Sequence, residues 1–245
     1  MLIPKNLIMR VVFSKILSFR VSGVLLLLLT FMLMQPAKSQ VVNETAKKKF
    51  SIGFGMFNDF LMNVPSGIKT RTINQGVNVF ALYNIGFGKS NFGFSIGLGL
   101  TVHNIYGNFL VKKSGDTTNL VKIPDTVSFK RSKMTYVNLD VPLEFTLKTK
   151  SKVVLALGIK LGYLIGSHTM YVGNGQVETK DYTTLKVKIK NVGIPNLQQF
   201  SYGPTLRFGY KWISIDGQYL LSTIFQKNHG PDIYPVSVGL VLMPF

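Results

Sequence analysis

The stretch MTYVNLDVPLEFTLKTKSKVVLALGIKLGYLIG, residues 134–166, carries the clearest structural pattern in the sequence. It is rich in Leu and Val, but charged residues interrupt it, so it holds no run of about 20 apolar residues that could form a spanning helix. Its large apolar residues alternate instead with small or polar ones. A period of two predicts β-strands whose successive side chains point to opposite faces of a sheet.

The alternation divides this stretch into two strands joined by a tight turn at 149–151. Folding the chain at that turn aligns the apolar rows and places Leu147 opposite Val153. The same register places Asp140 opposite Lys160 on the polar side, where the two could form a cross-strand ion pair. The stretch therefore predicts a hairpin with one apolar face and one small, charged face.

Six further segments alternate in the same way, which brings the expected number of strands to eight. They are residues 50–56, 77–87, 92–103, 200–210, 213–221 and 234–245. Short connections at 88–91, 149–151 and 211–212 alternate with long ones at 58–76, 104–126, 167–199 and 222–233. Short turns on one side and long loops on the other are typical of an outer-membrane barrel with both termini on the short-turn side.

The outward rows also match at the other short turns, where Phe87 meets Phe92 and Tyr210 meets Ile213. We therefore predict an all-β, eight-stranded, antiparallel up-and-down transmembrane β-barrel. A soluble β-sandwich would expose Lys, Glu and Thr on its polar face, and a lipocalin-like barrel would place its bulky residues inside. Here the second face carries Gly, Ser, Ala and isolated charges, as a narrow lumen requires. Residues 181–192 also alternate, and we interpret them as a hairpin above the membrane that pairs with 168–172.

The N-terminus predicts a secretory signal peptide. A basic start precedes the apolar run VSGVLLLLLTFMLM (21–34), and Ala37 and Ser39 suit a cleavage site before Gln40. We therefore expect a signal peptide at 1–39 and a barrel domain at 40–245, with Met9 as an alternative initiator. The alternative, an uncleaved anchor, would need a longer apolar run.

Composition narrows the function classes. The net charge is +18, and +13 remains for residues 40–245 once the leader is removed. The lysines are scattered over turns and loops, so we expect no nucleic acid as a partner but lipid headgroups or sugar phosphates. The chain has no Cys and 3 His, none beside a nucleophile motif or at metal-ligand spacing. We therefore expect no enzyme activity, no cofactor and no metal.

Charged residues on the lumen side are candidates for a functional site. Besides Asp140 and Lys160, the expected register pairs Arg207 with Asp216, whereas Glu144 has no obvious partner. Buried ions in a narrow barrel need partners to offset desolvation. These pairs could form a static plug or a gate that opens for ions.

The long loops could carry recognition. Their basic residues could hold lipopolysaccharide phosphates or a partner protein. The candidate residues are Lys112, Lys113, Lys186, Lys188 and Lys190.

The segments YVNLDVPLEFTLK (136–148) and VVLALGIKLGYLIG (153–166) resemble the small outer-membrane β-barrel proteins of the Bacteroidota, the PorT-like "porin family". This resemblance implies a location in the outer membrane and a role associated with protein secretion. The C-terminal residues Phe245, Met243 and Val241 look like the signal that the barrel-insertion machinery reads. The even row of that strand, from Val236 to Leu242, is more apolar, so its facing stays open.

These observations together predict a non-enzymatic scaffold or interaction protein in the outer membrane. Its expected partners are membrane lipid and lipopolysaccharide, the insertion machinery and secretion-system proteins. The alternatives are a small ion or solute channel gated by the lumen salt bridges, and a lipid-modifying barrel enzyme.

Overall fold

The computed structural model describes residues 49–88, 90–174 and 186–243. The predicted signal peptide therefore lies outside the described residues. Within these residues, no helix is long and apolar enough to cross a membrane. The described residues all belong to one compact unit.

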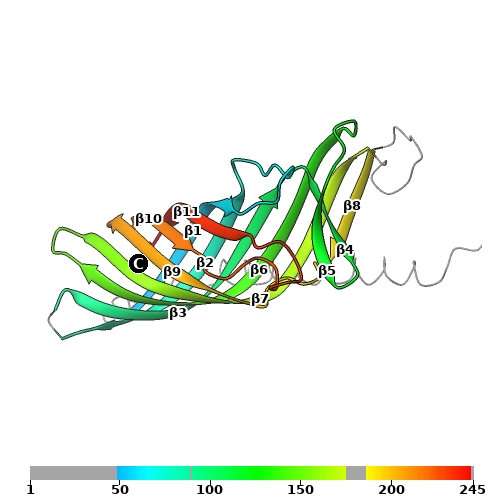
Figure 1. Cartoon of the computed structure of the whole chain (residues 1–245). Helices are drawn as coiled ribbons and strands as arrows, with labels where there is room; N and C mark the ends of the chain where they lie inside the picture. Colours follow the sequence, from blue (N-terminus) through cyan, green and yellow to red (C-terminus); the bar gives the residue numbers. More distant parts are fainter. Residues whose placement is uncertain (1–48, 89, 175–185, 244–245) are drawn as a thin grey trace, which may run out of the picture. The chain divides into compact units, whose positions relative to one another are not determined.

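Eight antiparallel strands close into a barrel, as predicted (Figure 1). They are β1 (Phe50–Met62), β2 (Gln75–Gly86), β3 (Phe92–Tyr106), β6 (Phe129–Lys148), β7 (Val153–Asn174), β9 (Phe200–Tyr210), β10 (Ile213–Tyr219) and β11 (Tyr234–Leu242). Each strand pairs with the next barrel strand along the chain, β11 pairs with β1, and β6 pairs with β7. Closure satisfies the backbone of every strand edge, which a strand in hydrocarbon requires.

The large apolar residues face outward, where a soluble protein would not place them. Leu98 is 62% exposed and Phe145 64%, while Ser95 and Thr101 of the opposite row are buried. The soluble β-sandwich and the lipocalin-like barrel are therefore wrong, because the exposed apolar row needs hydrocarbon around it. Aromatic side chains lie near both ends of this belt, among them Tyr83, Tyr163, Phe200, Tyr210 and Trp212.

Three short turns lie at one end of the barrel, and two of them have the predicted register. Phe87 donates its amide to Phe92, and Tyr210 lies opposite Ile213. The third turn is a correction: Leu147 lies opposite Leu155 instead of Val153. That turn ends at Lys152, whose φ is 65°. The turn is therefore centred one residue later than expected, and the register between β6 and β7 shifts by two residues. A shift of two residues keeps every side chain on its face.

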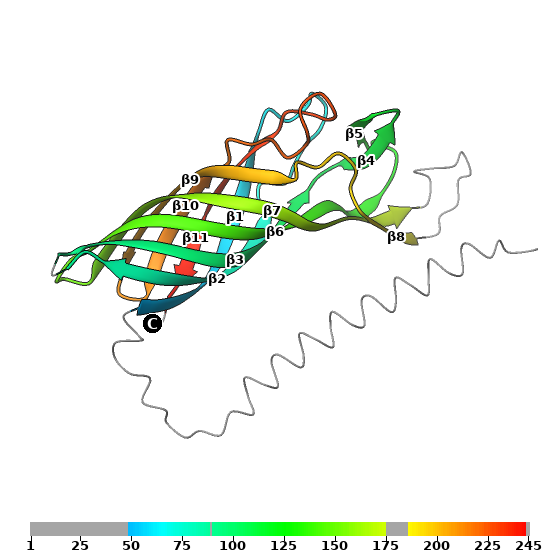
Figure 2. The same ribbon diagram turned by 90° about the horizontal axis from the view of Figure 1, so that it is seen from below.

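At the other end, β6 and β7 extend beyond the remaining barrel strands (Figures 1 and 2). There β8 (Lys186–Val192) adds to the edge of β7, with His168 opposite Val192 and Asn174 opposite Lys186. This pairing was predicted. A hairpin of β4 (Phe109–Ser114) and β5 (Thr117–Lys122) was not predicted, and it turns at Gly115, whose φ is 58°.

A bulge in β7, at the start of this extension, changes which of its side chains face outward. Val137 pairs with Gly166 but Asn138 with Leu164, so one extra residue enters β7. Below the bulge the odd-numbered residues of β7 face outward, and above it the even-numbered ones do, because an extra residue reverses the alternation.

Candidate functional site

Ion pairs fill the middle of the lumen. Lys160 Nζ lies 3.9 Å from Asp140 Oδ2, which also accepts a hydrogen bond from the Thr101 hydroxyl. These are the two residues expected to pair, but the shifted register puts Lys160 opposite Pro142 and Asp140 opposite Gly162. The long Lys160 side chain reaches its partner diagonally.

The predicted pairing of Arg207 with Asp216 is corrected. The two residues are opposite each other on β9 and β10, but the Arg207 guanidinium donates to the Glu144 carboxylate on β6. It reaches across β7, whose residues between them are the small Ala156 and Gly158. Glu144 thus gains the partner that the sequence did not reveal.

Gly158 is required by this arrangement. A Cβ there would collide with the carbonyl oxygen of Leu143 and approach Glu144 Cγ to 2.9 Å. The ion pair is deeply buried, since Arg207 is 3% exposed and Glu144 6%. The small residues of β7 are therefore what allow two long charged side chains to meet inside the barrel.

Little space remains between these charges. A cavity of about 20 Å³ lies among residues that include Asp140, Glu144, Lys160 and Asp216. A cavity needs roughly 10–15 Å³, on the same measure, to hold one water. The middle of the lumen therefore has room for a water molecule but not for a solute.

A second polar cluster lies nearer the loop end and was missed in the sequence. His103 Nδ1 is 2.8 Å from Asp59 Oδ2, and the Ser237 hydroxyl donates to Asp59 Oδ1 at 2.6 Å. The His103 ring stacks on Tyr136 at 4.5 Å between centroids, and Phe57 meets it edge-on. His103 is buried on the lumen side of β3, and nothing in the sequence pairs it with Asp59.

This cluster is not a nucleophile–base arrangement. The Ser237 hydroxyl donates to the carboxylate instead of to the imidazole, whereas a catalytic serine donates to its base. In the part of the chain that the structure describes, no group of three His, Cys, Asp or Glu could hold a metal ion.

An apolar cap closes the loop end of the lumen. It combines strand residues with residues of the long loops, and its members are Ile105, Phe109, Met134, Tyr136, Ile194, Leu197, Ile224, Phe225 and Ile233. Leu197 and Phe225 form an isolated β-bridge, which ties two of the loops together. A path through the barrel would have to cross this apolar layer as well as the ion pairs.

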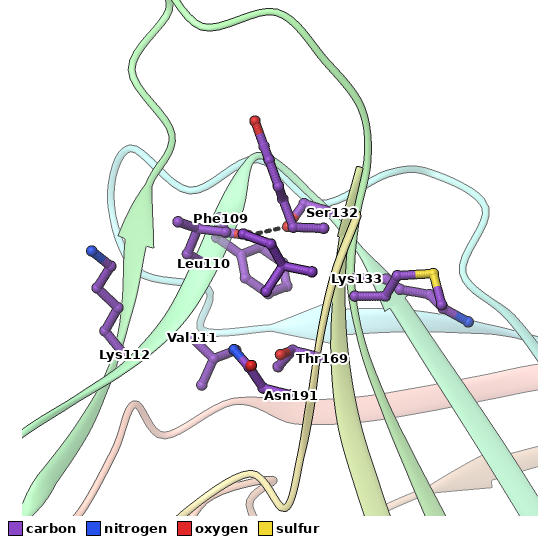
Figure 3. A pocket seen from close by; sticks show the side chains of 11 residues that line it. Phe109, Leu110, Val111, Lys112, Ser132, Lys133, Thr169 and Asn191 are labelled. Carbon is purple, nitrogen blue, oxygen red and sulfur yellow. Dashed lines mark hydrogen bonds between the residues drawn. The ribbon is translucent and has the colours of Figure 1, made fainter. Parts of the chain in front are cut away.

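The predicted recognition lysines separate into two groups. Lys112 and Lys113 are on β4, whereas Lys186, Lys188 and Lys190 are on β8. A cavity of about 40 Å³ lies between β4 and the inner face of β6, β7 and β8 (Figure 3). Ser132 donates to the Phe109 carbonyl across it. Ile123, Val127 and Tyr171 form a small core beside it.

The predicted insertion signal is partly described. Phe245 lies outside the described residues, and Met243 donates its amide to the Trp212 carbonyl at 2.7 Å. Val241 is 2% exposed and faces the lumen, while Leu240 is 56% exposed and faces outward. The more apolar even row therefore faces lipid, and an outward apolar row through Val241 is excluded.

A closed barrel with an apolar outside and a charged lumen is an integral β-barrel of the outer membrane. The chain matches the family described as "Outer membrane protein beta-barrel domain" over residues 39–223, and it belongs to that family. No curated protein matches it.

Two similar solved structures are of Ail, the attachment invasion locus protein of Yersinia pestis, one of them in complex with the heparin analogue sucrose octasulfate. Both are 14% identical to this chain and cover 80% of it. They match over 98% and 97% of their own chains, with TM-scores of 0.37 and 0.36. Similarity at this distance assigns no function.

Proposed function

We propose that this outer-membrane barrel acts without catalysis, as a scaffold or interaction protein whose binding surfaces lie outside the lumen, and that it serves protein secretion in a PorT-like manner. The observation that carries the proposal is the closure of the lumen by the Arg207–Glu144 and Lys160–Asp140 pairs below the apolar cap. A sealed interior leaves the extension of β6, β7 and β8 and the β4–β5 hairpin as surfaces for partners.

The link to secretion rests on the resemblance of residues 136–166 to PorT-like proteins. Deleting the gene should therefore remove a defined set of proteins from the culture supernatant, measured by quantitative proteomics. Restoring the full-length protein should return them. An unchanged supernatant would refute the secretion role while leaving the scaffold role to be tested separately.

The scaffold role is tested by site-specific photo-cross-linking in living cells. A cross-linker at exposed Lys113 on β4 should trap a discrete protein partner. The matched control is Lys150 in a short turn at the opposite end of the barrel, which should trap a different set or none. The same pattern at both positions would contradict the assignment of the binding surface to the extension.

A further inference from the structure

Five cations share the outward face of the sheet formed by β6, β7 and β8 above the membrane. On β7, Met170 lies between Lys133 and Lys190, and Val172 lies between Arg131 and Lys188. Lys186 follows on the same face, opposite Asn174. We call Arg131, Lys133, Lys186, Lys188 and Lys190 the basic face. Residues that lie directly opposite one another on paired strands share a face.

The described residues supply no counter-charge for this face. The residues paired with its cations are neutral: Tyr106, Met170, Val172 and Asn174. The ion pairs among the described residues are formed elsewhere. Lys133 is instead held by the Asn104 side-chain oxygen at 2.7 Å and the Tyr106 ring at 5.5 Å. Burial and then the positive charges of Arg131 and Lys190 lower the pKa of Lys133. A bound anion would therefore offset the repulsion among these cations.

The basic face is continuous with the lipid-facing belt. On β7 the outward row runs through Leu161, Tyr163 and Ile165, and after the bulge it continues through His168, Met170 and Val172. Val192, 70% exposed, lies beside His168 on this face. A lipid whose acyl chains cover the belt would therefore point its headgroup toward the basic face.

The height of the face selects the kind of lipid. Met170 is five residues beyond Ile165, about 17 Å along the strand and about 13 Å along the membrane normal at a tilt of about 40°. A glycerophospholipid headgroup layer is only about 5–8 Å thick. The phosphorylated and carboxylated sugars of lipopolysaccharide extend further than that.

We infer that the basic face binds the anionic carbohydrate headgroup of lipopolysaccharide in the outer leaflet, with the acyl chains on the apolar belt below. This binding goes beyond the proposed function and holds whether or not the barrel has a protein partner. Arg131, Lys133, Lys188 and Lys190 contact phosphate or carboxylate groups, and Met170 and Val172 pack between them against the sugar.

The test measures affinity of the folded, detergent-solubilised protein for rough lipopolysaccharide carrying a phosphorylated core. The variant K133Q/K188Q/K190Q should bind about 100-fold more weakly at low salt, which is about 3 kcal/mol. The control K150Q/K211Q/K227Q removes the same charge from exposed positions in two short turns and a loop, and should change the affinity less than about threefold. Circular dichroism checks that both variants fold.

Vesicles containing phosphatidylglycerol distinguish this ligand from an ordinary anionic lipid, and wild type should bind them far more weakly than lipopolysaccharide. Equal losses in the two triple variants would overturn the inference, because net charge would then explain binding. Equal affinity for phosphatidylglycerol would overturn the choice of a carbohydrate headgroup. A basic-face variant that keeps lipopolysaccharide affinity but loses a cross-linked protein would assign the face to that protein instead.

Discussion

Breaking the buried pair of Arg207 and Glu144 should destabilise the barrel in an asymmetric way. Arg207→Met keeps much of the side-chain volume but removes the guanidinium, which also lies over the Phe80 ring, and it leaves the Glu144 carboxylate buried and unpaired. Removing one partner of such a pair costs about 3–5 kcal/mol. Glu144→Gln should cost less, about 1–2 kcal/mol, because Asp216 lies directly opposite Arg207 and can take over as its partner.

The double variant E144Q/R207M removes both charges and should be more stable than R207M alone. We expect a coupling free energy of about 2 kcal/mol or more between the two positions. The assay is urea-dependent folding into phosphatidylcholine vesicles, followed by the fluorescence of Trp212, the single tryptophan, which lies half-exposed in a short turn. A loss below about 1 kcal/mol for R207M, or a double variant no more stable than R207M, would refute a buried, obligatory pair.

Three further outcomes follow from the same structure. In planar bilayers the protein should give no conductance steps, and neither should D140N or D216N, because the apolar cap remains closed; steps in D140N alone would instead support a salt-bridge gate. Gly203→Ala should lose about 1–3 kcal/mol of folding free energy in the urea assay, because its Cβ would collide with the Tyr219 carbonyl oxygen. The control Gly217→Ala, with its nearest atom at 3.8 Å, should fold like wild type, and equal losses would contradict this packing argument. Burial and then the positive charges of Lys190 and Lys133 lower the pKa of His168 below 6.5. Because the unfolded chain then binds this proton at a higher pH than the folded barrel does, folding stability should fall as the pH drops below about 6.5. Lys190→Gln should raise the pKa of His168 in an NMR titration, and an unchanged value would show that Lys190 does not act on it.

The strands could be predicted from the sequence because hydrocarbon imposes alternation on every spanning segment. Phe94, Leu98 and Leu143 identify their face by residue type alone, and a register error of two residues leaves that face unchanged. The same tolerance explains why the turn near Lys152 was placed one residue early without harm to the fold. Side-chain partners cannot be read from the alternation in the same way. The Arg207–Glu144 pair forms because Ala156 and Gly158, on the strand between them, are small.

The loop end was harder to predict because no repeat period marks it. Ile194, Leu197 and Phe225 come from irregular segments and meet only after the barrel brings the loops together. Asp59 and His103 are likewise 44 residues apart and on strands that are not paired with each other. A polar residue inside an otherwise apolar strand end, such as Asp59, is the signal that could have pointed to this cluster, since a buried carboxylate needs donors.

The bulge at Ile165 links the membrane belt to the surface above it. Without the extra residue, the odd row of β7 would continue outward, so Tyr171 would leave the small core with Ile123 and Val127 and face solvent. Met170 would then turn inward beneath the β4–β5 hairpin, and the cations paired with it would lose their common face. One inserted residue thus allows a single strand to present hydrocarbon-facing side chains below and a cationic surface above, on the same side of the sheet. That geometry, more than the number of lysines, is what would bring a lipid headgroup and its acyl chains onto one continuous surface.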